Sequence, residues 1–437
     1  MWHYHPDLLA TPVPRYTSFP TAAEFSPAVG AEDLDRALRS VSGDVSLYLH
    51  IPFCESICWY CGCNTAANNR QDRLASYLDA LHRDIALTAK RLDGRAKVRR
   101  IAFGGGSPNA ISPTEFVRLI DALTLQTQLV DPVWSIELDP RTLTETWGQT
   151  LAFVGVSRAS MGVQTFAPHL QAAIGRVQPD AMIAEGTALL RRSGITSLNF
   201  DLMYGLPGQS WHDLEASLAR TVELGADRIA LFGYAHVPHM IPRQKRINAQ
   251  HLPDQAERFA MAAMGHDYLV AAGYVPIGFD HFALPSDPMA QVAREGRVRR
   301  NFQGFTDDQA PVLIGLGASS ISMFPDVIVQ NEKNAGRYRM LLSQDCVPGV
   351  GGVRRSALDQ ELGGIINELL CQGRAPIGAE RMAAMAPLFT RFTSRGLAAV
   401  DGDMLTILPG GVPYARTVAA LFDPYRQDSA RRFSSAV

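Results

Sequence analysis

Short apolar runs recur along the first 280 positions of the chain and alternate with longer amphipathic stretches. Seven of these runs have the length and the β-branched or aromatic content of strands. They are SLYLHI (46–51), RRIAFG (99–104), WSIEL (134–138), RASMGV (158–163), SLNFDLMYG (197–205), RIALFGY (228–234) and YVPIGF (274–279). Strands that alternate with helices predict βαβ units, an α/β fold and a parallel sheet.

The stretches between the runs show helical periodicity. DRLASYLDALHRDIALTAKRL (72–92) places four apolar residues on one helical face, namely Leu74, Leu78, Leu81 and Ile85. PTEFVRLIDALTLQT (113–127) is a second helical stretch. The repeated units predict a full or partial (β/α) barrel, whose active site would lie at the carboxyl ends of its strands.

The C-terminal part of the chain has a different pattern. VPGVGGVRR (347–355) is a glycine-rich break, and two helical patterns and a last helix follow it. LAAVDGDMLTILP is typical of a hairpin with Asp401-Gly402 at its turn. Helices with a hairpin resemble a winged-helix unit, but the neutral charge favours a packing or lid domain over DNA binding. We predict an N-terminal extension packing on the barrel (1–45), a barrel domain (46–345) and a mainly helical C-terminal domain with a hairpin (346–437).

Composition narrows the class of protein. The 437 residues are 46% apolar and 19% charged, which excludes global disorder and allows two or three domains. A net charge of −2 argues against nucleic-acid binding over a broad surface. The N-terminus lacks a basic segment followed by an apolar one, and no run of about 18 apolar residues predicts a membrane span. We therefore expect a cytoplasmic protein.

Four of the six cysteines lie within CESICWYCGCN (54–64), with the spacing Cys54-x3-Cys58-x2-Cys61-x-Cys63. In a cytosolic protein such a cluster binds metal or performs redox chemistry more often than it forms disulfides. Structural zinc prefers two cysteine pairs on separate turns, and a redox dithiol needs only one CxxC. An iron–sulfur cluster is the third and favoured interpretation, because CxxxCxxC supplies three thiolates to a four-iron cubane and leaves one iron open.

CxxxCxxC in a loop that follows a strand resembles the radical S-adenosylmethionine (SAM) enzymes. The resemblance implies that Cys54, Cys58 and Cys61 hold a [4Fe-4S] cluster and that the amino and carboxylate groups of SAM bind its open iron. Cleavage of SAM would then give methionine and a 5′-deoxyadenosyl radical. We expect Cys63 to lie beside the cluster without ligating it, because a fourth protein ligand would leave SAM no iron. The two cysteines outside this loop, Cys346 and Cys371, are expected to be ordinary buried thiols.

Over nearly its whole length the sequence is similar to the oxygen-independent coproporphyrinogen III oxidases. Two features, CGCN and NFQGF, distinguish these enzymes from related haem chaperones. The matching segments are PRYTSFPTA (14–22), LYLHIPFC (47–54), CGCN (61–64), GGGSP (104–108), IELDPR (136–141), SMGVQTF (160–166), DLMYGLP (201–207), YAHVP (234–238), GFDHFA (278–283) and RNFQGFT (300–306). The implied fold is a partial barrel of radical SAM type.

The resemblance also implies which residues bind SAM. Gly105, Gly106 and Ser107 match positions that touch SAM, and Tyr48 and Glu137 match positions that bind the cluster-bound SAM. Positions that match a second SAM site are Tyr60, Gly106, Ser107, Gln164, Arg176, Asp201, Ala235 and Ile321, and the same region is expected to include Phe302 and Gln303. Independently of the resemblance, the glycines of GGGSP allow close approach of backbone to a ligand, although a tight turn alone would also explain them. Glu137, Gln164 and Asp201 each lie at or near the end of a predicted strand.

The implied reaction removes a hydrogen atom and then carbon dioxide from each of two propionates of coproporphyrinogen III, giving protoporphyrinogen IX without a catalytic protein base. The substrate carries four carboxylates, for which Arg15, Arg299 and Arg300 are candidate partners. His236, His239 and His281 are equally explained as structural residues. The implied partners are the tetrapyrrole and an electron donor such as flavodoxin or ferredoxin, and we expect a monomer. A haem chaperone and a haem-modifying radical SAM relative remain as alternatives.

Overall fold

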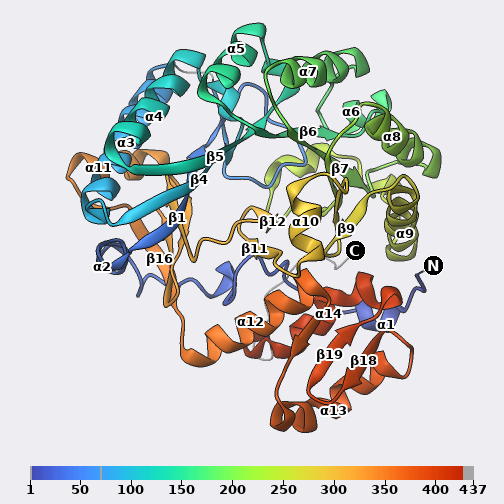
Figure 1. Cartoon of the computed structure of the whole chain (residues 1–437). Coiled ribbons are helices and arrows are strands. Elements are labelled where there is room, and N and C mark those ends of the chain that lie inside the picture. Colours follow the sequence, from blue (N-terminus) through green and yellow to red (C-terminus); the bar gives the residue numbers. More distant parts are fainter. Residues whose placement is uncertain (1, 69–70, 427–437) are drawn as a thin grey trace.

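A curved twelve-stranded sheet forms the body of the computed structural model, which describes residues 2–68 and 71–426 (Figure 1). Its seven central strands are parallel and follow the order β13-β1-β4-β5-β6-β7-β8. Their bounds are β1 (Gly43–Ile51), β4 (Ala96–Gly105), β5 (Gln128–Leu138), β6 (Arg158–Gln164), β7 (Ser197–Tyr204), β8 (Arg228–Gly233) and β13 (Val312–Leu316). Short antiparallel strands extend both edges, namely β9 (Val275–Ile277), β10 (His281–Ala283), β14 (Ile321–Met323), β15 (Val327–Asn331) and β16 (Gly349–Arg354).

Helices cover the outer face of this sheet and form an arc around it in Figure 1. They are α3 (Gln71–Leu92), α4 (Pro113–Gln126), α5 (Glu145–Val154), α7 (Asp180–Arg192), α8 (Trp211–Glu223) and α9 (Gln255–Ala271). The predicted apolar face of α3 is buried in the main core at Leu78, Leu81 and Ile85, and Leu74 packs against it. The α/β class, the partial barrel and six of the seven predicted parallel strands are therefore confirmed.

Two strands of the sheet differ from the prediction. The YVPIGF run forms β9, which is antiparallel to β10, because the three residues that join them are too few for a parallel crossover. The seventh parallel strand is instead β13, which the sequence analysis missed. Gly315 weakens the strand signal of this run, but a Cβ there would lie 2.7 Å from the carbonyl oxygen of Ile321 on β14.

The predicted glycine-rich break at 347–355 is wrong, because most of it is the edge strand β16. A Cβ on Gly352 would collide with the carbonyl oxygen of Ile328 on the neighbouring strand, so close strand pairing explains the glycines. The sheet therefore continues to Arg354, beyond the end predicted for the barrel. The division into 1–45, 46–345 and 346–437 stays a prediction.

The C-terminal part contains the predicted helices and hairpin. Its elements are α12 (Ala357–Gln372), β17 (Arg374–Pro376), α13 (Ala379–Thr393), β18 (Ala398–Asp401), β19 (Met404–Ile407) and α14 (Ala415–Ala419). The hairpin turn is Gly402-Asp403, one position later than predicted, because Asp401 still pairs with Met404. Cys371 is buried as expected, whereas Cys346 is exposed.

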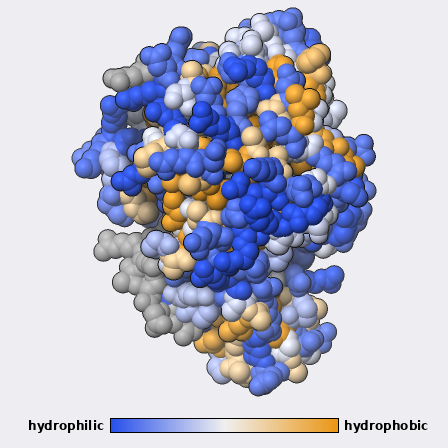
Figure 2. All heavy atoms as spheres, turned by 90° about the vertical axis from the view of Figure 1, so that its left-hand side faces the viewer, coloured by the Kyte–Doolittle hydropathy of each residue, from blue (hydrophilic) through white to orange (hydrophobic). Residues whose placement is uncertain are grey.

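The N-terminal segment contributes to two cores. Val29, Leu34 and Leu38 join the main core of the sheet and its helices. Residues closer to the N-terminus belong instead to a second core with α12, α13 and α14, namely Leu8, Leu9, Val13, Tyr16 and Phe19. On the face shown in Figure 2, polar side chains predominate and apolar ones form small groups. Among the described residues, no helix combines the length and the hydropathy that a membrane crossing requires.

A buried ion-pair network fixes the loop after β12 (Gly304–Thr306) to the inner face of the sheet. Asp307 accepts hydrogen bonds from Arg100 on β4, at 2.6 Å, and from Arg158 on β6, at 2.8 Å. Burial opposes the charge of Asp307, but the hydrogen bonds from Arg158 and Arg100 outweigh it and hold its pKa below the usual range. Removal of this carboxylate would leave two guanidinium groups, only 17% and 12% exposed, without their shared hydrogen-bond acceptor.

We therefore expect Asp307→Asn to lower the free energy of unfolding by about 3–5 kcal/mol. Thermal unfolding of the variant and the unaltered protein, in the same cofactor state, measures the effect. Asp131→Asn is the matched control, because the Asp131 side chain is 99% exposed and its pairing with Arg99 is long, at 4.0 Å. A surface change of this kind alters stability by about 0.5 kcal/mol or less. Equal effects of the two substitutions would contradict the assignment of a buried network.

Candidate functional site

The cysteine-rich loop begins where β1 ends and lies against the GGGSP loop that ends β4. The backbone N–H of Gly106 donates to the carbonyl oxygen of Ile51 at 2.9 Å, and that of Ser107 donates to Phe53 at 2.7 Å. A Cβ on Gly106 would lie 2.5 Å from the carbonyl oxygen of Phe53. The glycine is therefore required for the contact between the two loops. The hydroxyl of Ser107 donates to Asn109 at 2.7 Å.

One cavity at the carboxyl ends of the strands brings most of the predicted site residues together. Cys54, Cys58 and Cys61 line it, as does the exposed Cys63. The other predicted residues in its wall are Tyr60, Gly105, Gly106, Ser107, Glu137, Gln164, Arg176 and Asp201. Its volume is about 750 Å³, including the space at its open mouth. The cavity therefore combines soft sulfur donors with carboxylates, amides and exposed backbone.

The three predicted cluster ligands lie close enough to influence one another. Burial raises the pKa of Cys54 to about 12, and the nearby Cys61 and Cys58 add to the rise. A hydrogen bond between the Cys63 and Cys61 side chains lowers the pKa of Cys61 to about 6 and contributes to raising that of Cys63. Within the described residues, no three His, Cys, Asp or Glu side chains converge as ligands of a single ion would. A cationic iron–sulfur group would stabilise all three thiolates, so this donor set fits such a group.

Two arginines surround the sulfur of Cys58. Arg176 donates to it at 3.2 Å and Arg141 at 3.4 Å. Both arginines also pair with the buried carboxylate of Asp139, at 3.5 Å and 2.6 Å. Burial opposes the charge of Arg176, but the nearby Tyr60, Asp139 and Cys58 raise its pKa. Two cations therefore lie against the sulfur of a predicted cluster ligand.

Glu137 and Asp201 form an acidic wall opposite the thiols. Glu137 accepts a hydrogen bond from the backbone of Gly105 at 3.2 Å, and its carboxylate contacts the cavity. The surrounding protein desolvates this carboxylate and raises its pKa to about 7, and the charge of Asp201 adds to the rise. Burial also raises the pKa of Asp201, which accepts from Ser160 and Asn199. A cationic ligand group would relieve the repulsion between these carboxylates.

Five predicted residues lie outside the wall of this cavity. Gln303 lines a second cavity, which shares Glu137, Ser160 and Asp201 with the first. The hydroxyl of Tyr48 forms a hydrogen bond with Nδ1 of His50 at 3.2 Å. Burial raises the pKa of Tyr48, and the nearby charge of Glu137 adds to the rise. Of the remaining three, Ala235 lies at the start of the loop after β8, and Ile321 lies on β14. Phe302 lies in the turn before β12.

Ala235 is nevertheless tied to the cysteine loop through Gln244. The buried amide of Gln244 donates to the carbonyl oxygens of Tyr60, at 3.0 Å, and Ala235, at 3.1 Å. It also accepts from the backbone of Val237 at 2.6 Å. Gln244 therefore positions two of the predicted residues relative to one another, although no sequence motif pointed to it.

Asp139, Arg141 and His50 also belong to the site, although none of them was predicted as a site residue. The first two belong to the IELDPR segment, from which only Glu137 was chosen as a site residue. His50 lies beneath Gly105, and a Cβ on that glycine would collide with its ring. Burial lowers the pKa of His50 to about 4, so it is neutral and can accept a hydrogen bond.

The candidate substrate residues have different environments. Arg299 is exposed and donates to the carbonyl oxygen of Gln309 at 2.9 Å. His281 pairs with Asp280 at 2.6 Å, His236 bonds to Tyr234 at 2.8 Å, and His239 is exposed. Arg15 and Arg300 lie together, because the side chain of Arg300 donates to the carbonyl oxygen of Arg15 at 3.2 Å.

Comparisons with known proteins agree with this geometry. The sequence model of the radical SAM superfamily matches residues 48–220. The oxygen-independent coproporphyrinogen III oxidase of Bradyrhizobium diazoefficiens is 40% identical over 97% of each chain. The corresponding protein of Pseudomonas aeruginosa is 34% identical over 97% of this chain and 96% of its own. The solved structure of the coproporphyrinogen III oxidase of Escherichia coli, a radical SAM enzyme, has a TM-score of 0.91 at 32% identity and covers 97% of this chain and 99% of that one.

The contact between the two loops gives a direct prediction about Gly106. We expect Gly106→Ala to lower the free energy of unfolding by about 1–3 kcal/mol, because its Cβ meets the backbone of Phe53. Gly364→Ala is the matched control, since a Cβ there meets nothing within 4 Å and the residue is exposed within α12. That change should stabilise the protein by about 0.5–1 kcal/mol. Thermal unfolding of both variants measures the difference, and stabilisation by both would contradict the close contact.

Proposed function

Because this chain belongs to the oxygen-independent coproporphyrinogen III oxidases, we propose that it converts coproporphyrinogen III to protoporphyrinogen IX by oxidative decarboxylation of two propionate side chains. The observation that supports this most directly is the single cavity that contains three thiols in CxxxCxxC spacing, the GGGSP loop and two carboxylates. The similarity to relatives with this activity extends over nearly the full length of both chains.

The cofactors of this enzyme are a [4Fe-4S] cluster and SAM. We assign Cys54, Cys58 and Cys61 as the cluster ligands and leave Cys63 outside the ligand set. When bound, the cluster and SAM supply a 5′-deoxyadenosyl radical that removes a hydrogen atom from a substrate propionate. Arg141 and Arg176 donate hydrogen bonds to the sulfur of Cys58, and Asp139 holds both guanidinium groups in place.

The other cavity residues bind and orient SAM in this proposal. Glu137 offers a carboxylate to its ribose hydroxyls or ammonium group, and the GGGSP loop, at Gly105, Gly106 and Ser107, allows the ligand to approach its backbone. Tyr48 adjoins Glu137. A second SAM molecule would contact the loop and a further group, namely Tyr60, Gln164, Arg176, Asp201, Ala235, Phe302, Gln303 and Ile321. No residue is assigned as a general base, because carbon dioxide leaves once the substrate radical has lost an electron.

The reaction requires an electron donor and an electron acceptor from outside the chain. We propose a one-electron donor of the flavodoxin or ferredoxin class, a monomeric enzyme and a location in the cytoplasm. The net charge of −2 supports the absence of a nucleic-acid partner.

An anaerobic product assay tests the function. Reconstituted enzyme with coproporphyrinogen III, SAM and a chemical reductant should form protoporphyrinogen IX together with 5′-deoxyadenosine and methionine. Tight haem binding without product would support a haem chaperone. S-adenosylhomocysteine as the by-product would indicate a methylating relative, and either result would contradict the proposed reaction.

Single cysteine variants test the ligand set. Cys58→Ala should abolish the visible absorbance of the cluster, because one of its three protein ligands is lost. Cys63→Ala is the matched control in the same loop and should retain a cluster that still binds SAM. Absorbance spectra and iron content after anaerobic reconstitution measure both outcomes. Loss of the cluster in the Cys63 variant would make that residue a ligand and would contradict the open iron.

A further inference from the structure

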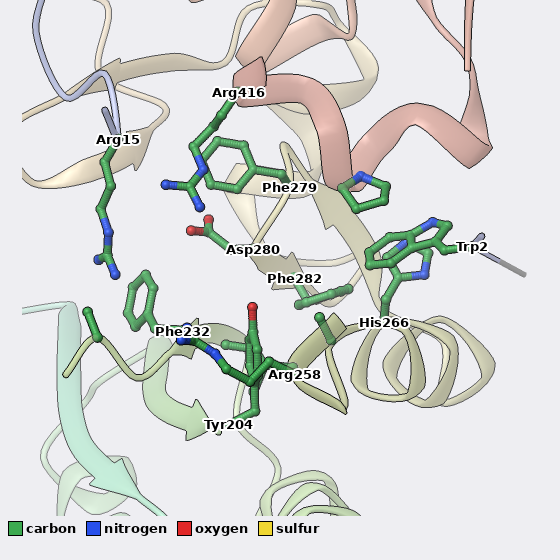
Figure 3. Close-up of a pocket in the computed structure, with 15 residues that line it drawn as sticks. Trp2, Arg15, Tyr204, Phe232, Arg258, His266, Phe279, Asp280, Phe282 and Arg416 are labelled. Atoms are coloured by element: carbon green, nitrogen blue, oxygen red, sulfur yellow. The ribbon is translucent and has the colours of Figure 1, made fainter. Parts of the chain in front are cut away.

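A third pocket lies between the N-terminal segment, the ends of β7 and β8, α9 and the C-terminal helix α14 (Figure 3). Three arginines line it, Arg15 from the N-terminal segment, Arg258 from α9 and Arg416 from α14. Figure 3 shows their side chains reaching into the pocket around Asp280. Of the residues singled out from the sequence, its wall includes Ala235 and the candidate substrate residue Arg15, whereas Arg258 and Arg416 were not predicted.

The pocket has more positive than negative charge. Asp280 is the one acidic residue among the described residues of its wall, and its carboxylate already pairs with His281 at 2.6 Å. Within the described part of the chain, the guanidinium groups of Arg15 and Arg258 have neither a hydrogen-bond acceptor nor an ion-pair partner, and Nε of Arg258 is buried. Arg15 lies instead over the ring of Phe232, at 5.8 Å from its centre.

A fourth arginine increases the repulsion. Arg300 lies beside Arg15 and over the rings of Phe279 and Phe305. Burial lowers the pKa of Arg416 to about 10, and the nearby charge of Arg15 adds to this. Burial and then the charge of Arg15 also lower the pKa of Arg258. Cations placed together without enough carboxylates are unfavourable, so an anionic ligand would stabilise this arrangement.

Shared wall residues place the pocket next to the second cavity, and the second cavity next to the cysteine cavity. Phe232 lines both this pocket and the second cavity. Glu137 and Asp201 line both the second cavity and the cysteine cavity. A large ligand that extends through the second cavity would therefore have one end at the thiols and the other at the arginines.

We propose that Arg15, Arg258 and Arg416 bind the carboxylates of the tetrapyrrole propionates that are not reacting. The inference rests on the proposed function, which places the reacting propionate at the cysteine cavity. Guanidinium groups bind carboxylates through paired, charge-assisted hydrogen bonds. The aromatic walls at Phe232 and Phe279 would pack against the pyrrole rings. The pocket thus selects a substrate by its remote carboxylates.

Kinetics of arginine variants test this assignment. Arg258→Gln and Arg15→Gln should each raise the KM for coproporphyrinogen III about 10- to 100-fold, because a charged hydrogen-bond partner is lost. Arg258→Lys, which keeps the charge, should recover part of the affinity. Arg192→Gln is the matched control, since that side chain is 63% exposed on α7 and lies outside the pocket. Reductant-driven SAM cleavage without substrate should be unchanged in every variant, which shows an intact cluster site.

A binding measurement separates this inference from the proposed function. The unaltered holoenzyme should bind coproporphyrin III, a tetracarboxylate probe, much more tightly than its uncharged tetramethyl ester, and Arg258→Gln should weaken only the binding of the acid. Failure of the unaltered enzyme to form product would overturn the function. An active enzyme whose variants keep the KM and the preference for the acid would overturn the pocket assignment alone. If one variant fails to fold, the other arginine variant and the ester comparison still decide the outcome.

Discussion

The contact between the cysteine-rich loop and the GGGSP loop is the constraint on which the site depends. Backbone groups of Gly106 and Ser107 donate to Ile51 and Phe53, so the end of β1 and the end of β4 are joined main chain to main chain. No side chain fits between them at Gly106. This contact fixes the three thiols relative to the backbone and carboxylate groups that we propose bind SAM. A displacement here would separate the two cofactors that must react together.

The charges of the neighbouring cavities are arranged in three zones. Arg141 and Arg176 surround Cys58, where thiolates are needed. Burial raises the pKa of Glu137 and of Asp201 beside the thiols, where a sulfonium cofactor with an ammonium group would bind, and the charge of Asp201 adds to the rise at Glu137. Arg15 and Arg258 lie at the far end, where substrate carboxylates would bind. The acidic zone and the far arginine zone each concentrate charge of one sign, which a ligand of the opposite charge would relieve.

Local patterns predicted the local features of the molecule. The periodicity of α3 and the apolar runs of β1 and β4 to β8 correctly placed most of the barrel, and the spacing of the cysteines pointed to the cavity at its mouth. The strand β13 was missed because Gly315 interrupts its apolar run, although close packing requires that glycine. Glycines likewise made the edge strand β16 look like a break. In both strands the close approach of the neighbouring strand explains the glycines, and the sequence of the strand itself does not.

The supporting residues of the site could not be predicted because their partners are distant in sequence. Gln244 reaches Tyr60 across 184 positions, and Arg176, to which only the family resemblance pointed, contacts Cys58 across 118. Arg258 and Arg416 meet Arg15 only after the N-terminal and C-terminal segments pack together. Asp139 and Arg141 are the exception, because they lie in the same IELDPR segment as Glu137, which was already predicted as a site residue.

The central claim is that one iron of the cluster is left free for SAM, and magnetic resonance tests it most directly. Electron–nuclear double resonance of the reduced enzyme with SAM labelled with ¹⁵N at its amino group and ¹⁷O at its carboxylate should show coupling of both nuclei to the cluster. A cluster that shows neither coupling while SAM is bound, or whose irons are all ligated by protein side chains, would contradict the account.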